Sequence, residues 1–443
     1  MRSLAATWRR YWFAPAPLLD LAFARIAIVG FQLWFVARPS YRITVLARTG
    51  LPDSLYDPLP LVHALVWPVG WNYRPGEGTL ELVLAMTIAA GVLALVGLFT
   101  NLALAVFALG CAFLQAFVYS FGDFHHPEAV LMIALGLLAV SPAGGVLSVD
   151  DLRRRFLRAR KAGRFLDFDL KREESRWAGW PLKLTGWVFV LIYASATYFK
   201  LERAGLAWVN GYTLRHGLIQ DALRWDLPLA HWVAGHHSLA VLMSWMSFLF
   251  ESTFILVMIF PVVRWVYVPF GATFHLMIYA LIRATFQGYV AAYSVFVPWR
   301  DGIERLAKRF RHAAQQPLVF YDAACALCHR SMTLLRYWDW LDRVELRTLQ
   351  EATESTRAQG LDPGELRREM HVVLPNGDVL RGFFAFRRLL GELPPLWPLV
   401  PVFYLPVANV IGPRVYRWIA RRRHRILCDG ESCALHQARS SVS

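Results

Sequence analysis

The chain has 443 residues, of which 56% are hydrophobic and 18% charged, and its formal net charge is +15. A soluble domain usually carries about one quarter charged residues, so this composition argues against a wholly soluble protein. The five cysteines do not form a disulfide-stapled secreted scaffold. The basic residues stand in short blocks between apolar segments, which is typical of membrane topology rather than of a nucleic-acid partner.

Residues 1–305 contain apolar segments that are long enough, or nearly so, to cross a bilayer core of about 30 Å, and we expect about eight spans. They lie near 18–37, 79–99, 101–121, 127–147, 180–200, 238–260, 262–283 and 285–299. Most contain Gly, Ser or Thr, which lets helices approach closely in lipid. The first is too long for the apolar core of a cleavable signal peptide.

The positions of Lys and Arg predict the orientation of these spans. Residues 1–11 carry three Arg, the 148–179 loop carries ten Lys plus Arg, and 300–311 carry five. With eight spans these three segments fall on one side, which the positive-inside rule makes cytoplasmic. Both termini are then cytoplasmic, and in a bacterium the protein would lie in the inner membrane.

After residue 305 the sequence changes to a basic linker at 306–316 and then to the pattern of a soluble domain at 317–443. Leu318–Tyr321 reads as a buried strand, and the Pro375-Asn376-Gly377 turn predicts a hairpin. Further helices are expected near 328–341, 384–391 and 408–422, and a further strand at 343–349. The sequence therefore predicts an α-helical polytopic membrane domain followed by a C-terminal α/β domain.

Cys325 and Cys328 form a Cys-x-x-Cys pair where this first strand should lead into a helix. The positive end of a helix stabilises a thiolate, so Cys325 is the candidate nucleophile and Cys328 the resolving thiol. The alternative is half of a zinc site, completed by Cys428 and Cys433. Because no second pair has close Cys-x-x-Cys spacing, we favour the redox role and predict no metal.

The stretch around the two cysteines resembles the Asp-x-x-Cys-x-x-Cys signature of the DCC family of thiol-disulfide oxidoreductases. It reads Tyr321-Asp322-Ala323-Ala324-Cys325-Ala326-Leu327-Cys328. The Asn376-Gly377 hairpin, with Gly382 and Ala385 after it, extends the resemblance over about 317–425. The resemblance implies a thioredoxin-like fold, a redox site of Cys325, Cys328 and Asp322, and protein thiols or disulfides as partners. No proline stands immediately before His371, where thioredoxin-like sites usually have a cis-proline.

Ionisable residues at membrane depth are costly, so each one is a candidate for function. His125 and His126 open the predicted fourth span, and Lys200 closes the fifth, all at the outer end. His275 lies in the outer half of the seventh span, and Glu251 is somewhat deeper in the sixth. Their similar depth indicates one site. The alternatives are that Lys200 reaches to the headgroups and that His275 is a hydrogen-bonded packing residue.

The same region resembles the vitamin K-dependent γ-carboxylases and corresponds to the HTTM domain, over about 10–305. Four stretches carry the resemblance: Tyr198–Glu202 with Trp208–Tyr212, His125-His126 ahead of Ser148–Asp150, Phe250-Glu251, and Phe274–Leu276 with Phe296–Trp299. It implies that Lys200 is a base acting on a reduced, vitamin K-like quinone and that His126 and His275 belong to the active site. Glu251 and His125 are further candidates for the cofactor site.

In that family, oxygenation of the deprotonated quinone yields a strong base that removes a proton from a glutamate γ-carbon, and CO2 captures the carbanion. The family's large extracytoplasmic domain has no counterpart between residue 300 and the C-terminal α/β domain, so peptide carboxylation itself is not implied. The leading hypothesis is an integral membrane enzyme of this type fused to a cytosolic thiol oxidoreductase. The alternatives are a membrane-anchored oxidoreductase and a non-catalytic lipid- or quinone-binding membrane domain.

Overall fold

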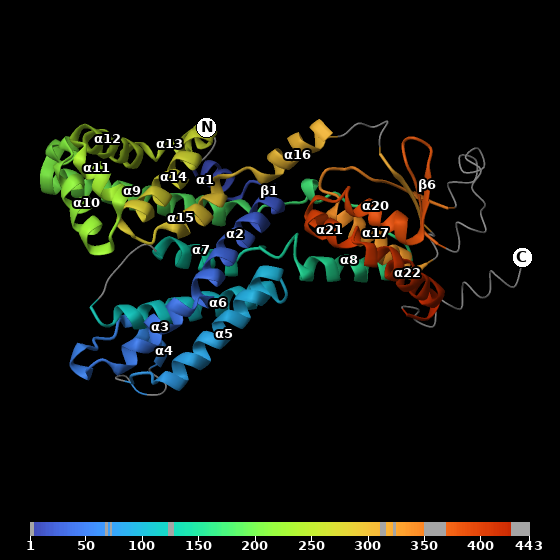
Figure 1. The fold of residues 1–443 in the computed structure, drawn as a ribbon, viewed down its shortest axis with the longest axis horizontal. Helices are drawn as coiled ribbons and strands as arrows, with labels where there is room; N and C mark the ends of the chain where they lie inside the picture. The colour runs from blue at the N-terminus through green and yellow to red at the C-terminus, as the bar shows by residue number, and fades with distance from the viewer. Residues whose placement is uncertain are drawn as a thin grey trace, which may run out of the picture. The chain divides into compact units, whose positions relative to one another are not determined.

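The computed structural model describes residues 4–66, 70, 73–122, 128–310, 316–321, 325–349 and 369–426. The chain divides into two compact units: unit 1 is Met1–Val149 with Glu174–Pro298, and unit 2 is Asp150–Glu173 with Trp299–Ser443. The predicted boundary near residues 305–317 differs from this division in one respect. Residues 150–173, expected as a loop of the membrane domain, group with the C-terminal residues, and Figure 1 labels their helix α8.

Unit 1 is built from helices, with one small antiparallel pair of strands, β1 (Ala16–Pro17) and β2 (Glu174–Ser175). Its longer α-helices are α1 (Leu4–Phe13), α2 (Leu18–Ala37), α5 (Glu77–Val96), α6 (Thr100–Tyr119), α7 (Ala129–Ala139), α9 (Gly179–Ala204), α10 (Tyr212–Trp225), α12 (His237–Thr253) and α14 (Arg264–Ile282). Shorter ones are α3 (Pro39–Ala47), α4 (Pro60–Val66), α11 (Pro228–Gly235), α13 (Leu256–Ile259) and α15 (Gln287–Ala292).

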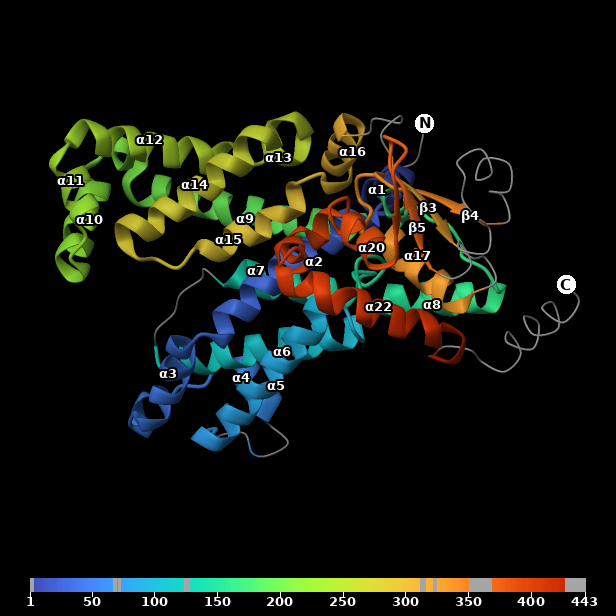
Figure 2. The same ribbon diagram turned by 45° about the vertical axis from the view of Figure 1, so that its right-hand side comes forward.

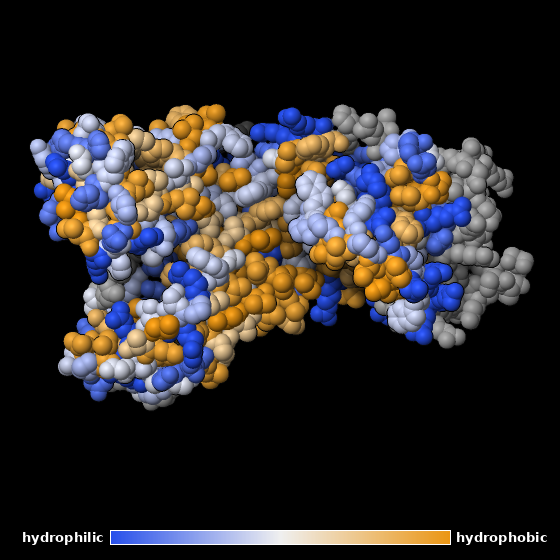
Figure 3. All heavy atoms as spheres, in the orientation of Figure 1, coloured by the Kyte–Doolittle hydropathy of each residue, from blue (hydrophilic) through white to orange (hydrophobic). Residues whose placement is uncertain are grey.

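Among the described residues of unit 1, five helical segments are long and apolar enough to cross a membrane, which is compatible with a multi-pass membrane protein. They are Leu18–Ala37, Glu77–Val96, Thr100–Tyr119, Gly179–Asn210 and Pro261–Ile282. The helices α11 and α12 are long and apolar enough only when taken together, and the chain bends by 101° between them. Hydrophobic residues cover much of the surface around α5 and α6 in Figure 3, as expected for helices that face lipid.

Two of the predicted spans are shorter than expected. The 285–299 segment forms the six-residue helix α15 and the 3-10 turn η6 (Tyr293–Phe296), and six helical residues extend only about 9 Å. Tyr289 and Tyr293 in this segment are buried inside the protein, so its apolar character reflects packing rather than lipid contact. In 127–147 the described helix is α7, which ends at Ala139, before Pro142.

A buried arginine organises the chain after α7. Arg25 on α2 is fully buried, and its guanidinium donates to the carbonyl oxygens of Ala143 (3.2 Å) and Leu147 (2.5 Å). Gly97, at φ +72°, makes room for it, since a Cβ there would lie 2.6 Å from an Arg25 nitrogen. The carbonyl oxygens of Ala143 and Leu147 lie outside a helix and have no helical donor, and each thus accepts a hydrogen bond from the charged guanidinium.

Unit 2 contains a four-stranded mixed sheet whose strand order is β4-β3-β5-β6. The strands are β3 (Leu318–Tyr321), β4 (Glu345–Thr348), β5 (His371–Val373) and β6 (Val379–Arg381). β3 is parallel to β4 and antiparallel to β5, and β5 and β6 form the predicted hairpin, with Gly377 at φ +89° in the turn. Figure 2 shows β3, β4 and β5 side by side.

Helices complete unit 2 around this sheet. They are α8 (Val149–Ala162), α16 (Trp299–Phe310), α17 (Ala326–Trp338), α20 (Gly382–Leu390), α21 (Val400–Phe403) and α22 (Pro406–Ile426), with the 3-10 turns η3 (Leu170–Arg172) and η8 (Pro394–Leu399). Side chains from α17, α20 and the sheet form one apolar core, which includes Val319, Met332 and Leu389. Phe320 belongs to a second cluster with Val373, because successive strand residues face opposite sides.

Candidate functional site

Cys325 stands at the start of α17, directly before its first residue. Its backbone is extended (φ −98°, ψ 116°), and its carbonyl oxygen accepts the first helical hydrogen bond from the His329 N–H at 3.1 Å. The Cys325 side chain is buried, whereas that of Cys328, in the first turn, is half-buried. Neither forms a disulfide. The first cysteine therefore lies at the positive end of the helix, where a thiolate is stabilised.

β3, the strand that precedes Cys325 in the chain, pairs at its C-terminal end with the start of β5. His371 opens β5, pairs with Phe320 across the sheet and is fully buried, and its Nδ1 lies 2.9 Å from the Glu369 carbonyl oxygen. Met370 occupies the position before β5, and its N–H donates to the Tyr416 hydroxyl on α22 at 2.9 Å. A hydrogen bond from the Met370 backbone to the Tyr416 side chain thus ties the start of β5 to α22.

Asp322 of the predicted thiol site lies outside the described residues, as do Cys428 and Cys433 of the alternative zinc site. Within the part of the chain that the structure describes, no three His, Cys, Asp or Glu side chains group as metal ligands. The zinc alternative would need Cys428 and Cys433, so it stays a separate hypothesis.

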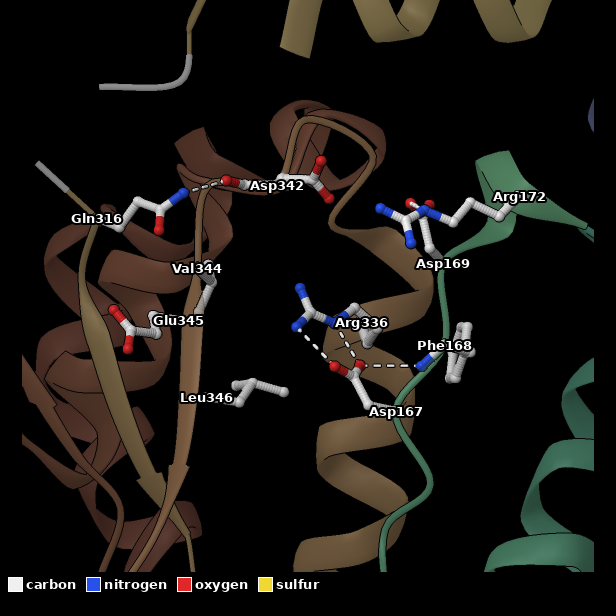
Figure 4. Close-up of a pocket in the computed structure, with 10 residues that line it drawn as sticks. All are labelled: Asp167, Phe168, Asp169, Arg172, Gln316, Arg336, Asp342, Val344, Glu345 and Leu346. Carbon is white, nitrogen blue, oxygen red and sulfur yellow. Dashed lines mark hydrogen bonds and ion pairs between the residues drawn. The ribbon is translucent and has the colours of Figure 1, made fainter. Parts of the chain in front are cut away.

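A cavity of about 490 Å³ lies at the opposite end of β3 from the cysteines. Figure 4 shows its lining: Asp167, Phe168, Asp169, Arg172, Gln316, Arg336, Asp342, Val344, Glu345 and Leu346. Gln316 precedes β3 and Glu345 opens the parallel strand β4, whereas Cys325 follows the other end of β3. The cavity is therefore separate from the thiols.

The 150–173 segment is held at this cavity by ion pairs. Asp167 receives two hydrogen bonds from the Arg336 guanidinium, at 2.8 and 3.3 Å, and Lys171 pairs with Asp342 at 2.9 Å. The Phe168 ring lies 6.4 Å from that of Tyr337 on α17. These contacts fasten the segment to residues of unit 2 that come much later in the chain, since Asp167 and Arg336 are 169 residues apart.

A buried carboxyl closes the turn between α17 and β4. Asp339 accepts hydrogen bonds from the backbone N–H groups of Arg343 (2.7 Å) and Val344 (3.3 Å). Arg336 lies 3.4 Å from the same side chain. Burial raises the pKa of the Asp339 carboxyl to about 6, against the opposing effect of these donors.

In unit 1, Lys200 forms an ion pair with Glu251. Lys200 lies four residues before the end of α9 and Glu251 on α12, with 17% and 9% of their side chains exposed. Ser247 lies 3.4 Å from the Lys200 amine and 3.3 Å from the Glu251 carboxylate. The amine also lies 4.2 Å from the centre of the Trp208 ring. The pair joins two helices in an apolar setting.

His275 belongs to a second polar cluster. Its Nε2 lies 2.7 Å from the Tyr193 hydroxyl, which also bonds the Tyr293 hydroxyl. All three side chains are buried, and the ring of Tyr289 packs against the imidazole at 4.7 Å. Among the described residues, His275 Nδ1 and the Tyr289 hydroxyl have no hydrogen-bond partner.

The structure therefore places Lys200 with Glu251 and His275 with Tyr193, rather than Lys200 directly against His275. Tyr193 and Lys200 are seven residues apart, so they lie on one face of α9, about two turns from each other. The buried Thr197 lies between them on that face. His125 and His126 lie outside the described residues.

The predicted site grouped Glu251 with Lys200, but it did not include Ser247 and Tyr193, which contact Lys200 and His275. The seven-residue spacing of Tyr193 and Lys200 was a usable signal, because it places two polar residues on one face of an apolar helix. Nothing in the sequence pairs Tyr193 with His275, which is 82 residues away. The ion pairs of Asp167 and Lys171 likewise had no local signal.

Residues 319–429 match the family model of DCC1-like thiol-disulfide oxidoreductases. No curated protein and no solved structure matches the chain. The matched residues include Cys325 and Cys328 and lie within unit 2. The match therefore supports a thiol-disulfide oxidoreductase role for the C-terminal part of the chain.

Proposed function

We propose that Cys325 and Cys328 carry out thiol-disulfide exchange in a thioredoxin-like domain. The observation that carries the proposal is the position of Cys325 at the start of α17, inside the residues similar to DCC1-like oxidoreductases. The strand order supports the fold: a parallel pair joined through α17 lies beside an antiparallel hairpin.

The exchange needs only the two thiols and a substrate disulfide. The Cys325 thiolate attacks one sulfur of the substrate, which forms a mixed disulfide and releases the other sulfur as a thiolate. The Cys328 thiolate then attacks Cys325 Sγ, and the second substrate thiol leaves. The substrate gains two electrons and two protons, and Cys325 and Cys328 become a disulfide. The reverse sequence oxidises a dithiol.

The test is reduction of insulin disulfides by the purified full-length protein, regenerated with dithiothreitol. Cys325→Ser should lower the catalysed rate to the background of dithiothreitol alone, because the attacking thiolate is gone. Cys111→Ser is the matched control, since Cys111 is buried in α6 of unit 1 and should leave the rate unchanged. Full activity of Cys325→Ser would refute the assignment.

For unit 1 we propose a membrane enzyme in which Lys200 acts as a base toward a reduced quinone. The buried Lys200–Glu251 pair favours this role over simple anchoring, because anchoring helices need no ion pair between them. The residues suit the ligand: the amine and Ser247 offer polar contacts to a ring oxygen, and Trp208 offers an aromatic face. A bound hydroquinone would supply the hydroxyl proton.

Glu251 has a defined part in this proposal. A protonated amine cannot act as a base, so Lys200 must first lose a proton, and Glu251 is the group in contact with it. We place this site in a multi-pass protein of the bacterial inner membrane with cytoplasmic termini. Oxidation of a hydroquinone by dissolved dioxygen, which accepts the two electrons, should be faster with the purified protein and should fall to the uncatalysed background in Lys200→Ala. Equal rates in the two proteins would leave the ion pair as a structural link between α9 and α12.

A further inference from the structure

Unit 2 carries an uncovered apolar corner where η8 and α21 meet α22. The chain bends by 107° between the helical segments Pro394–Phe403 and Pro406–Arg422. Taken together, the two segments are as long and apolar as a membrane span. Six large apolar residues of the corner are between 47% and 65% exposed: Leu399, Val402, Leu405, Val407, Val410 and Ile411. A contiguous patch of this kind on a small domain marks an interaction site.

The opposite face of α22 already packs on unit 2. Gly412 lies against the Phe383 ring of α20, so closely that a Cβ would come within 2.3 Å of it. Tyr416, one turn further on, bonds the Met370 N–H. α22 therefore has two apolar faces. One face packs on unit 2, and the exposed residues form the other face, which is not part of the core of the domain.

Charge is distributed unevenly along the same helix. Residues 393–426 contain no Asp or Glu and six Arg, at 414, 417, 421, 422, 423 and 425. Trp418 is half exposed, and the Arg422 guanidinium stacks on it at 4.5 Å. The exposed apolar residues up to Ile411 are thus followed by a segment, from Arg414 onward, that combines arginines with Trp418. Figure 3 shows hydrophobic residues over the first part of α22 and hydrophilic ones toward its end.

We propose that this corner docks on the surface of a bilayer that contains anionic phospholipid. The apolar residues would enter the boundary between headgroups and acyl chains, and Trp418 and the arginines would stay at headgroup level. The separation of the apolar residues at 399–411 from the arginines and Trp418 at 414–425 matches the change from acyl chains to headgroups across such an interface. The complete absence of acidic residues favours lipid phosphates over a protein surface of mixed charge.

Docking there also bears on the thiol site. α22 contacts α17, the helix that begins after Cys325, and its Tyr416 bonds the residue before β5. A docked α22 would hold the exchange site close to the lipid surface, within reach of thiols on membrane proteins. The proposal itself rests on the corner and its charges and holds whether or not the thiols are active.

The test uses spin labels on the full-length protein in nanodiscs that contain phosphatidylglycerol, with the native cysteines replaced. Labels at Val402→Cys and Val410→Cys should collide more with oxygen than with a water-soluble nickel chelate. The control label at Asp378→Cys, in the exposed β5–β6 turn, should show the reverse. Preferred collision with nickel at 402 and 410 would overturn the proposal. Loss of both kinds of collision would overturn it in favour of a protein partner.

The charge requirement has a separate arm. Replacing Arg414, Arg417 and Arg421 together by Gln should shift the equilibrium from docked to free about fivefold per arginine in anionic nanodiscs. The shift should be absent in phosphatidylcholine nanodiscs. The matched control replaces Arg153, Arg158 and Arg164, which are exposed elsewhere in unit 2, and changes the net charge equally. Equal shifts from both triple variants would contradict recognition by this face.

Discussion

The thiol site of unit 2 and the polar clusters of unit 1 place reactive groups by different means. Cys325 owes its setting to local structure: a strand ends, a helix begins, and the thiol stands at the helix start. Lys200 and His275 owe theirs to partners on other helices, Glu251 and Tyr193. The N-terminus of a helix can stabilise a nearby thiolate without a partner from another element. In an apolar helical unit, a polar side chain needs a tertiary partner.

The Lys200–Glu251 pair gives the largest expected stability effect. Lys200→Met or Glu251→Gln alone should lower the free energy of unfolding by about 3–5 kcal/mol, because each leaves a poorly solvated partner uncompensated. The double variant should recover much of that loss. The measurement is a double-mutant cycle of unfolding in mixed micelles. Additive losses would mean that the two residues do not stabilise each other.

Asp339 makes the stability of unit 2 depend on pH. Its pKa in the folded protein is raised to about 6, so the folded state binds the proton more tightly than the unfolded state. This contribution is fully present below the pKa of the unfolded group, near 4, and is lost as pH rises through about 6. It amounts to about 2–3 kcal/mol.

The check is the difference in unfolding free energy between the protein and Asp339→Asn, measured at several values between pH 4 and pH 7. The side-chain amide of the variant does not titrate. As pH rises, the unaltered protein should therefore lose unfolding free energy relative to the variant. A difference that stays constant over this range would contradict the raised pKa.

Two tyrosines beside His275 offer a matched pair of variants. Tyr193→Phe removes hydrogen bonds to His275 and Tyr293, and it should cost about 1–3 kcal/mol of unfolding free energy. Tyr289→Phe removes a buried hydroxyl that has no partner among the described residues, so it should be close to neutral. Thermal unfolding in detergent compares them. A similar loss in both would show that the Tyr289 hydroxyl is also hydrogen-bonded.

The smallest effect concerns the 150–173 segment. Asp167→Ala removes an ion pair with Arg336 whose carboxylate is mostly exposed, so the loss should be at most about 1 kcal/mol. Limited proteolysis near residue 165 should become faster. Arg158→Ala, exposed on α8, is the control and should change neither property. Identical behaviour of the two variants would mean that the ion pair does not hold the segment.

Local signals explain what the sequence predicted well. The apolar run Leu318–Tyr321, the Asn376-Gly377 turn and the Cys-x-x-Cys pair each encode their own conformation within a few residues, and β3, the hairpin and the start of α17 are present. The long helices α2, α5 and α6 were predictable for the same reason, since a predominantly apolar run of twenty residues is itself the signal of a membrane span.

Long-range contacts explain what it could not predict. Residues 150–173 belong to unit 2 through Asp167 and Lys171, whose partners stand in α17 and the turn after it. The 285–299 segment was predicted as a membrane span because it is apolar, but Tyr289 and Tyr293 in it pack inside unit 1. Hydropathy does not distinguish protein packing from lipid contact.

The proposed thiol-disulfide exchange requires Cys325 as the attacking thiol and Cys328 as the resolving thiol. The most direct measurement traps the intermediate: full-length Cys328→Ser is incubated with a disulfide peptide and analysed by intact mass and peptide mapping. We expect a stable mixed disulfide on Cys325 that is absent in Cys325→Ser and resolved in the unaltered protein. An adduct on Cys111 alone, or no adduct in Cys328→Ser, would contradict it.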